Sequence, residues 1–257
     1  MVDWDGDRYG DVSALQRMVA EASIHGLELA GDERLLDVGC GDGFITMQLA
    51  GRLPAGSVVG VDASRRMIDN ARARDPADEL GVQFHVDDVL ALPFDRDFDI
   101  VVSFNMLHWV HDHPAALARI ARSLDTGGRA VVQIVCATER RSIEDVAMGV
   151  AATPHWQPHF EDFPAPYLHA TPDQFRESAT TAGMTVSGIE ISDLRWQFES
   201  IDAFASWFGV GASDWTSRLP DDSASAFAHE VVERYQESIG EPATLHFGQM
   251  RVELELG

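Results

Sequence analysis

The sequence predicts an α/β fold in which a doubly wound, mostly parallel sheet of seven strands carries helical cap insertions. From Arg34 onward, short apolar runs alternate with amphipathic stretches, the pattern of parallel strands joined by crossover helices. The first apolar run ends in a glycine-rich turn that opens a helix. The 257 residues, of which 45% are hydrophobic, are enough for one large domain with a substantial core.

Five buried parallel strands are expected in the first half of the chain. Each is short and almost entirely apolar, because a parallel strand is covered on both faces. They comprise residues 34–38, 57–61, 82–86, 98–103 and 129–135.

Helices are expected between these strands. One runs from Phe44 to Arg52, one follows Ser64 as its N-cap, and one follows Pro114, whose fixed φ suits a first helical turn. Asp125 to Gly128 should end this last helix and turn the chain into the fifth strand.

After Ala137 the regular alternation stops. Residues 153–172 contain five prolines among aromatic and histidine side chains, a composition that excludes regular helix and central strand. This segment is either a lid over a pocket or a connector whose aromatics cover the core. The remaining chain predicts a helix after Thr171, a strand over 184–197, a helical region over 201–238 and a last strand over 244–255. The two late strands are expected to pair antiparallel at the sheet edge.

We therefore expect one domain over residues 1–257, with a ligand-binding core at 30–137. Residues 138–172 and 198–240 are expected to form cap segments on the side where a second substrate binds.

The charge balance restricts the partners. The chain has 42 acidic and 19 basic side chains, a formal charge of −23, and every basic one is arginine. Such a chain repels polyanions, so we expect no nucleic acid partner. Its apolar runs are too short to cross a membrane, and its two cysteines, Cys40 and Cys136, suit a reducing compartment. A cytoplasmic protein is expected, and the oligomeric state stays open.

The glycine-rich turn at Leu35–Gly43 is the most informative segment. Its glycines let a ligand approach the backbone closely. A dinucleotide fingerprint would require glycines at 39, 41 and 44, but position 44 is Phe. Asp37 and Asp42 also place negative charge where a pyrophosphate would bind, so the turn favours a ligand with cationic groups.

Acidic residues after the second and third predicted strands indicate that the ligand contains a nucleoside. Asp62 ends the second predicted strand, where a carboxylate can accept hydrogen bonds from two ribose hydroxyls. Asp88 and Val89 follow the third strand, where an acid beside an apolar residue can read an adenine amino group and pack on the ring.

Together these segments resemble the class I S-adenosylmethionine-dependent methyltransferases, which have a Rossmann-like fold. Leu35–Gly43, Val59–Ser64 and Val86–Pro93 are similar to the first three motifs of that family, in order. The resemblance continues through Phe98–Trp109 and Leu124–Ile134 and covers residues 4–137. Further similarity, to the trans-aconitate methyltransferase-like and methyltransferase type 11 subgroup, rests on Trp4, Tyr9 and the segment Asn105-Met106-Leu107-His108-Trp109.

The resemblance implies S-adenosylmethionine as cofactor, S-adenosylhomocysteine as product, and a role for each matching residue. Gly39 and Gly41 would face the methionine moiety and Asp37 its amino group. Asp62 would bind the ribose. The remaining implied cofactor contacts are Ala63 in the second motif, Met67, Asp88 and Val89 at the adenine, Ser103 and Asn105 near the sulfonium, and Tyr9 at the entrance.

His108 is the candidate catalytic residue, because the resemblance places it over the acceptor as a base or an orienting donor. With His111, Asp112 and His113 it forms a cluster of metal-ligand types. No further Cys or His motif completes a coordination shell, so we expect no metal and interpret His111 and His113 as polar loop residues.

The sequence leaves two roles open for several aromatic and arginine side chains in the second half of the chain. About half of the aromatics are expected to line an acceptor pocket and the others to form the cap core; the set is Trp156, Phe160, Tyr167, Trp207, Phe208 and Trp215. Arg140, Arg141 and Arg195 either hold an acceptor carboxylate or pair with surface acids, and surface pairing is favoured for each one singly.

The resulting hypothesis is transfer of a methyl group to a small molecule, at a carboxylic acid or hydroxyl oxygen. Alternatives are C- or N-methylation in a quinone or natural-product pathway, or a non-catalytic S-adenosylmethionine-binding module. A nicotinamide oxidoreductase is the third class, against which Phe44 and Asp42 argue.

Overall fold

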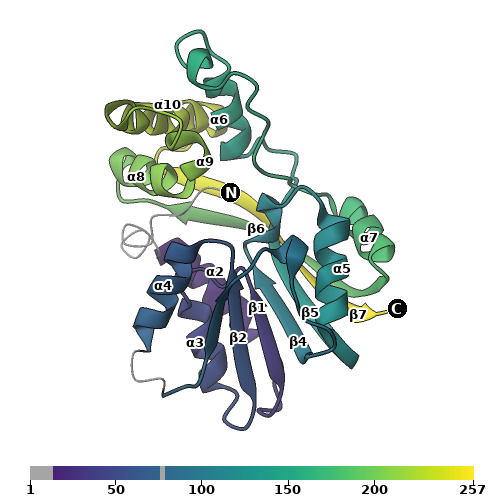
Figure 1. Ribbon diagram of the computed structural model, residues 1–257. Coiled ribbons are helices and arrows are strands. Elements are labelled where there is room, and N and C mark those ends of the chain that lie inside the picture. The colour runs from purple at the N-terminus through teal and green to yellow at the C-terminus, as the bar shows by residue number, and fades with distance from the viewer. Residues whose placement is uncertain (1–13, 76–78) are drawn as a thin grey trace.

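The computed structural model describes residues 14–75 and 79–257 and contains a seven-stranded sheet in the order β3-β2-β1-β4-β5-β7-β6 (Figure 1). Strands β1 to β5 are parallel, and β7 runs antiparallel to both β5 and β6. The bounds are β1 Arg34–Val38, β2 Ser57–Asp62, β3 Gln83–Val86, β4 Phe98–Phe104, β5 Leu124–Cys136, β6 Met184–Gln197 and β7 Thr244–Leu256. The predicted fold class and the antiparallel pairing of the late strands are confirmed.

Helices form two groups, one against the sheet and one beyond its end (Figure 1). The sheet group comprises α2 Ala14–His25, α3 Phe44–Gly51, α4 Arg65–Arg74, α5 His113–Ser123 and α7 Pro172–Thr181. The cap group comprises α6 Ile143–Ala151, α8 Ile201–Gly211, α9 Ser213–Thr216 and α10 Asp221–Ile239. Short 3-10 turns occur at Val89–Ala91, Leu107–Trp109 and Gln157–His159.

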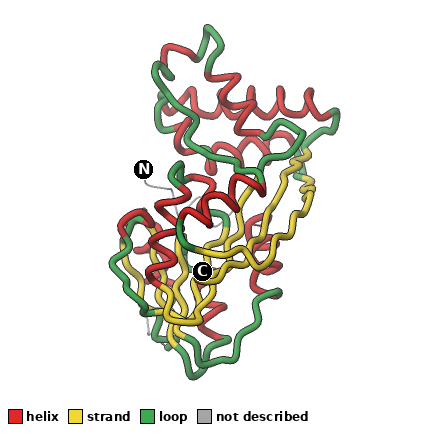
Figure 2. The backbone as a smooth tube through the Cα atoms, turned by 90° about the vertical axis from the view of Figure 1, so that its right-hand side faces the viewer, coloured by secondary structure: helices red, strands yellow, loops and turns green. Residues whose placement is uncertain are grey.

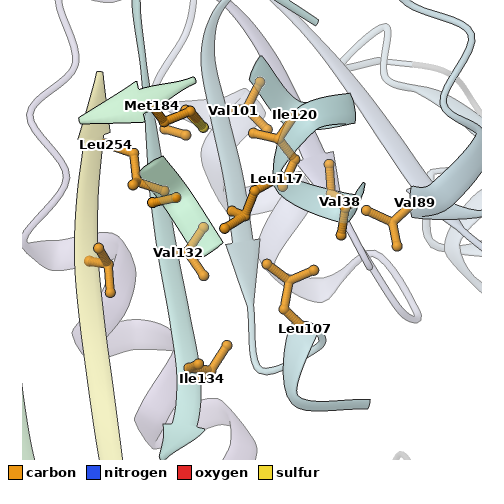
Figure 3. Close-up of a cluster of buried hydrophobic side chains, with 14 of the residues drawn as sticks. Val38, Val89, Val101, Leu107, Leu117, Ile120, Val132, Ile134, Met184 and Leu254 are labelled. Carbon is orange, nitrogen blue, oxygen red and sulfur yellow. The ribbon is translucent and has the colours of Figure 1, made fainter. Parts of the chain in front are cut away.

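Apolar side chains fill both faces of the sheet. Leu117 and Ile120 of α5 are fully buried against Val101 and Val132 of the central strands (Figure 3). On the opposite face, Leu49 of α3 belongs to a second cluster with residues of β1, β2 and β4. This two-sided burial explains why the central strands are almost continuously apolar.

The cap has its own core and packs on the projecting ends of β6 and β7. The pairing of β5 with β7 ends at Cys136 and Gly248, whereas β6 and β7 continue as a pair to Gln197 and Thr244. Residues 244–247 of β7 and their partners in β6 thus project about 13 Å past the end of β5, and the cap helices lie beside this projection (Figure 2). None of the helices in the described part of the chain is both long and apolar enough to cross a membrane.

Two local expectations need correction. Asp125–Gly128 is not a separate turn but an irregular start of β5, where the register shifts between Phe98 and Ile100. The Arg34 guanidinium fixes this segment by bonding Asp125 and Asp99, at 2.8 and 2.7 Å. Helix α5 begins one residue before Pro114 and is capped by Asp112, whose carboxylate accepts from the amide of Ala115.

Helix α6 was not predicted, although it has a complete capping box. The Ser142 hydroxyl accepts from the Asp145 amide and the Asp145 carboxylate accepts from the Ser142 amide, both at 3.0 Å. The proline-rich segment 153–172 contains no long helix and no strand, as expected, and holds the single 3-10 turn at Gln157–His159.

Candidate active site

A cavity of about 490 Å³ opens at the carboxyl ends of the parallel strands. The strand order reverses between β1 and β4, and open α/β sheets bind their ligands at such a point. One end of the cavity is lined by the glycine turn after β1 and by residues following β2, β3 and β4. The other end is lined by α6, α8, α9 and the projecting start of β7. The cavity therefore connects the sheet with the cap.

Backbone hydrogen bonds from β2 hold the glycine turn in place. The amides of Gly39 and Cys40 donate to the carbonyl of Val61 at 2.8 and 3.0 Å. Gly39 has φ +78°, and an added Cβ would lie 2.4 Å from Met106, so no other residue fits there. Gly41 has φ +55°, but an added Cβ would meet no atom within 4 Å. The backbone at Gly41 thus borders open space in the cavity.

Asp62 connects the turn to the next helix. One carboxylate oxygen accepts from the amide of Gly41 at 3.0 Å and the other from the amide of Ser64 at 2.8 Å. Ser64 then caps α4 by accepting from the amide of Met67 at 3.2 Å. This chain of contacts brings Asp62, Ala63 and Met67 to one wall of the cavity.

Asn105 forms the opposite wall, directly after β4. Its φ is +56°, a left-handed conformation that asparagine tolerates better than most residues. The backbone amide donates to the carbonyl of Gln133 at 2.7 Å, and the side-chain oxygen accepts from Gln249 at 3.1 Å. Both contacts fix Asn105 at the cavity wall, as is common for strained residues at functional sites.

Most of the predicted binding residues lie at this cavity. Its wall includes Gly39, Gly41, Asp62, Ala63, Met67, Val89, Asn105 and His108. Tyr9, like Trp4, lies outside the described residues. Cys40, Asp87 and Met106 also line the cavity and were missed, although each is adjacent in sequence to a predicted residue.

Three predicted residues do not line the cavity. Asp88 turns its carboxylate back to cap the following 3-10 turn, accepting from the amide of Leu90 at 2.9 Å, and Asp87 takes the place at the wall. Ser103 is fully buried inside β4. Asp37 is buried behind the turn, where it accepts from the Thr46 hydroxyl at 2.7 Å.

Burial raises the pKa of Asp37 to about 7; the Thr46 hydrogen bond opposes this shift and the charge of Asp62 adds to it. Because the folded-state pKa lies above the unfolded-state value, stability should fall as pH rises from about 4 to about 7. We expect Asp37→Asn to remove this dependence, so that its stability relative to the wild type increases across that window and is constant above it. Urea unfolding at a series of pH values measures this. Parallel pH profiles for the two proteins would contradict the assignment, and the exposed Asp69→Asn is the matched control.

The charge at Asp42 is partly neutralised, which the sequence did not indicate. Arg74 forms an ion pair with the Asp42 carboxylate and donates to its backbone carbonyl at 2.6 Å. Asp42 also accepts from the amide of Phe44 at 3.2 Å, at the start of α3.

Three of the six aromatic residues that could either line a pocket or form the cap core line the cavity. Trp207, Phe208 and Trp215 do, together with Trp109. Trp156 and Phe160 instead pack on Phe227 in the cap core. Tyr167 donates to the Asp145 carboxylate at 2.8 Å.

The three arginines form surface contacts. Arg140 pairs with Asp193, Arg195 pairs with Glu241 at 3.1 Å, and Arg141 donates to the carbonyl of Asp145 at 3.0 Å. None of the three lines the cavity. Within the described ranges, no group of three or more Cys, His, Asp or Glu side chains is placed to hold a metal ion.

Comparisons with known proteins agree with this geometry. Residues 35–128 match a family described as a methyltransferase domain. The trans-aconitate 2-methyltransferase of Mycolicibacterium gilvum is 30% identical over 205 residues, covering 77% of this chain and 76% of the relative. The chain belongs to the class I S-adenosylmethionine-dependent methyltransferases. Within them it belongs to the group similar to the trans-aconitate enzymes.

Solved structures share the fold of this methyltransferase. The YcgJ protein of Bacillus subtilis gives a TM-score of 0.66 at 18% identity and covers 93% of this chain and 97% of its own. Geranyl diphosphate C-methyltransferase of Streptomyces coelicolor, solved with S-adenosyl-L-homocysteine, gives 0.61 at 18% identity, covering 97% and 82%.

The cofactor of this methyltransferase is S-adenosylmethionine, and the cavity fits it. Open space beside the Gly41 backbone accommodates a close-lying ligand. Asp62 presents a carboxylate, and Met67 and Val89 present apolar surface, at the same end of the cavity. A ribose needs hydrogen-bond acceptors and an adenine ring needs apolar contacts, so these residues supply what the nucleoside requires.

Proposed function

We propose that this enzyme transfers the methyl group of S-adenosylmethionine to a small molecule bound in the cap end of the cavity. The observation that supports this most strongly is the continuity of the cavity from the glycine turn to the cap helices. Its volume of about 490 Å³ is typical of small-molecule sites.

The residues at the sheet end are assigned to the cofactor. Gly39 and Gly41 would border the methionine moiety, and Asp62 would accept hydrogen bonds from the ribose. Met67, Asp87 and Val89 would surround the adenine. When bound, the cofactor supplies a methyl group that is already activated by a positively charged sulfur.

The contribution of the protein is then mainly alignment. Asn105 and His108 lie at the cavity wall, between the sheet end and the cap. Burial, followed by the nearby His169 and His113, lowers the pKa of His108 to about 3. A group with that pKa is a poor proton acceptor at neutral pH, so we assign His108 to orienting the acceptor rather than to general base catalysis. Holding the two reacting atoms about 3 Å apart supplies most of the rate enhancement.

Relatives differ in the atom they methylate. The name of the Mycolicibacterium relative indicates a carboxylic acid acceptor, and that of the Streptomyces structure indicates a carbon acceptor. Both are small molecules, which agrees with the cavity. The acceptor class of this chain therefore has to be argued from its own cap residues.

Methyl-labelled S-adenosylmethionine tests the proposal. The full chain is incubated separately with the small-molecule filtrate, the protein fraction and the nucleic acid fraction of a cell extract. We expect label in an organic product of the filtrate, and none with Asp62→Ala. Label incorporated solely into protein or nucleic acid would contradict a small-molecule acceptor.

A further inference from the structure

The cap end of the cavity is mainly apolar and aromatic. Trp215 and Phe208 are 0% and 3% exposed, and Trp109, Trp207 and Phe247 also line the wall. The Trp109 and Trp215 rings meet edge to face, with centroids 6.5 Å apart. Such a wall binds an apolar or aromatic body and offers ring faces to a positive charge.

Carboxylates are the charged groups at this end. Glu144 at the start of α6 and Asp214 in α9 both line the cavity. Neither carboxylate accepts a hydrogen bond from another described residue. The nearest recorded partner of Glu144 is His169, at 4.0 Å, and its side chain is 18% exposed. Burial raises the pKa of Asp214, and the charge of Arg218 opposes this shift.

Cationic side chains are absent from the described part of the cavity wall, which contains no arginine. The sequence contains no lysine. His108 is held neutral by burial, and the imidazole of His246 is already engaged by the Glu241 carboxylate, 3.2 Å away. Arg218, whose charge acts on Asp214, is not part of the cavity wall. An acceptor carboxylate buried here would therefore face two acids and no arginine of the described wall, which is costly.

Two buried polar atoms of cavity-lining residues have no hydrogen-bond partner among the described residues, the Nε1 of Trp215 and the Nδ1 of His108. His108 is 5% exposed, lines the cavity, and its Nδ1 has no hydrogen-bond partner among the described residues. Buried polar atoms of native proteins are nearly always paired, so an unpaired one at a cavity wall indicates a ligand group. A neutral imidazole nitrogen can accept a hydrogen bond from a donor on that ligand.

We propose that the acceptor is an apolar molecule of about aromatic-ring size that carries a protonated amine, recognised by Glu144, Asp214 and the tryptophan wall. This inference rests on the proposed function. The proposed acceptor differs from that of the trans-aconitate relatives, whose name indicates an organic acid. The ammonium group would pair with a carboxylate at the cap end of the cavity and lie against the aromatic faces.

Three probes that share one phenylpropyl frame test this proposal: 3-phenylpropylamine, 3-phenylpropanol and 3-phenylpropionate. Each is titrated by calorimetry into the full chain saturated with S-adenosylhomocysteine. We expect the amine to bind at least about tenfold more tightly than the carboxylate, with the alcohol between them. Glu144→Gln and Asp214→Asn should each reduce the affinity for the amine about three- to tenfold and leave that for the alcohol unchanged. The exposed Glu139→Gln, outside the cavity wall, is the matched control.

The outcomes separate this inference from the proposed function. Binding of S-adenosylhomocysteine is measured first for every protein, and its loss in the wild type would refute the proposed function. If that binding is intact but the amine binds no better than the carboxylate, including the case in which neither binds, the acceptor inference is overturned. Preference for the amine that survives both substitutions would also overturn it.

Discussion

Asp62→Ala should weaken binding of S-adenosylhomocysteine by about 2–4 kcal/mol, or roughly 30- to 1,000-fold. The wild-type carboxylate lies at the cavity wall and accepts from the amides of Gly41 and Ser64 at 3.0 and 2.8 Å. Its removal takes away the acceptor assigned to the ribose and also releases the glycine turn from α4. Calorimetric titration of the full chain gives the change in affinity.

Asp69→Ala is the control for this substitution. Asp69 is on the neighbouring helix α4, its side chain is 61% exposed, and it does not line the cavity. We expect its affinity for S-adenosylhomocysteine to equal that of the wild type. An Asp62→Ala protein that has the stability of the wild type and binds S-adenosylhomocysteine equally well would show that Asp62 does not bind the cofactor.

The second large effect is expected for Gly41→Ala. Its added Cβ would meet no protein atom within 4 Å and would project into the space assigned to the cofactor. The φ of +55° also costs alanine about 1–2 kcal/mol of stability. We expect affinity for S-adenosylhomocysteine to fall at least about tenfold, measured by calorimetry, while the protein stays folded.

Gly183→Ala separates backbone strain from blocked space. Gly183 has φ +77° and also no atom within 4 Å of an added Cβ, but it lies in the turn before β6, outside the cavity wall. We expect a similar loss of stability without a change in affinity. Equal affinities for the Gly41→Ala and Gly183→Ala proteins would contradict the cofactor position.

The sheet core was predictable because its strands are buried on both faces and its turns use a small set of residues. Strand β1 has the predicted bounds, since its buried segment ends at Gly39, a position that no other residue can occupy. Ser64 was identified as an N-cap from its position before an amphipathic stretch, and its hydroxyl accepts from the Met67 amide.

The acceptor end of the cavity was not predictable, because residues far apart in sequence form it. Glu144, Asp214 and His246 belong to three separate elements, α6, α9 and β7, and each lines the cavity. No local pattern relates them. Whether Asp87 or Asp88 lines the cavity depends on one backbone turn, in which the Asp88 carboxylate accepts a hydrogen bond from the Leu90 amide. Helix α6 was an avoidable omission, since the capping box from Ser142 to Asp145 is visible in the sequence.

Calorimetric titration of the wild-type chain with S-adenosylhomocysteine, and separately with a nicotinamide dinucleotide, tests the central claim most directly. We predict saturable binding of S-adenosylhomocysteine at a single site, with a dissociation constant on the order of micromolar, and no binding of the dinucleotide. Binding of the dinucleotide without binding of S-adenosylhomocysteine would contradict the assignment of the glycine turn, Asp62 and the cavity that joins them to the cap.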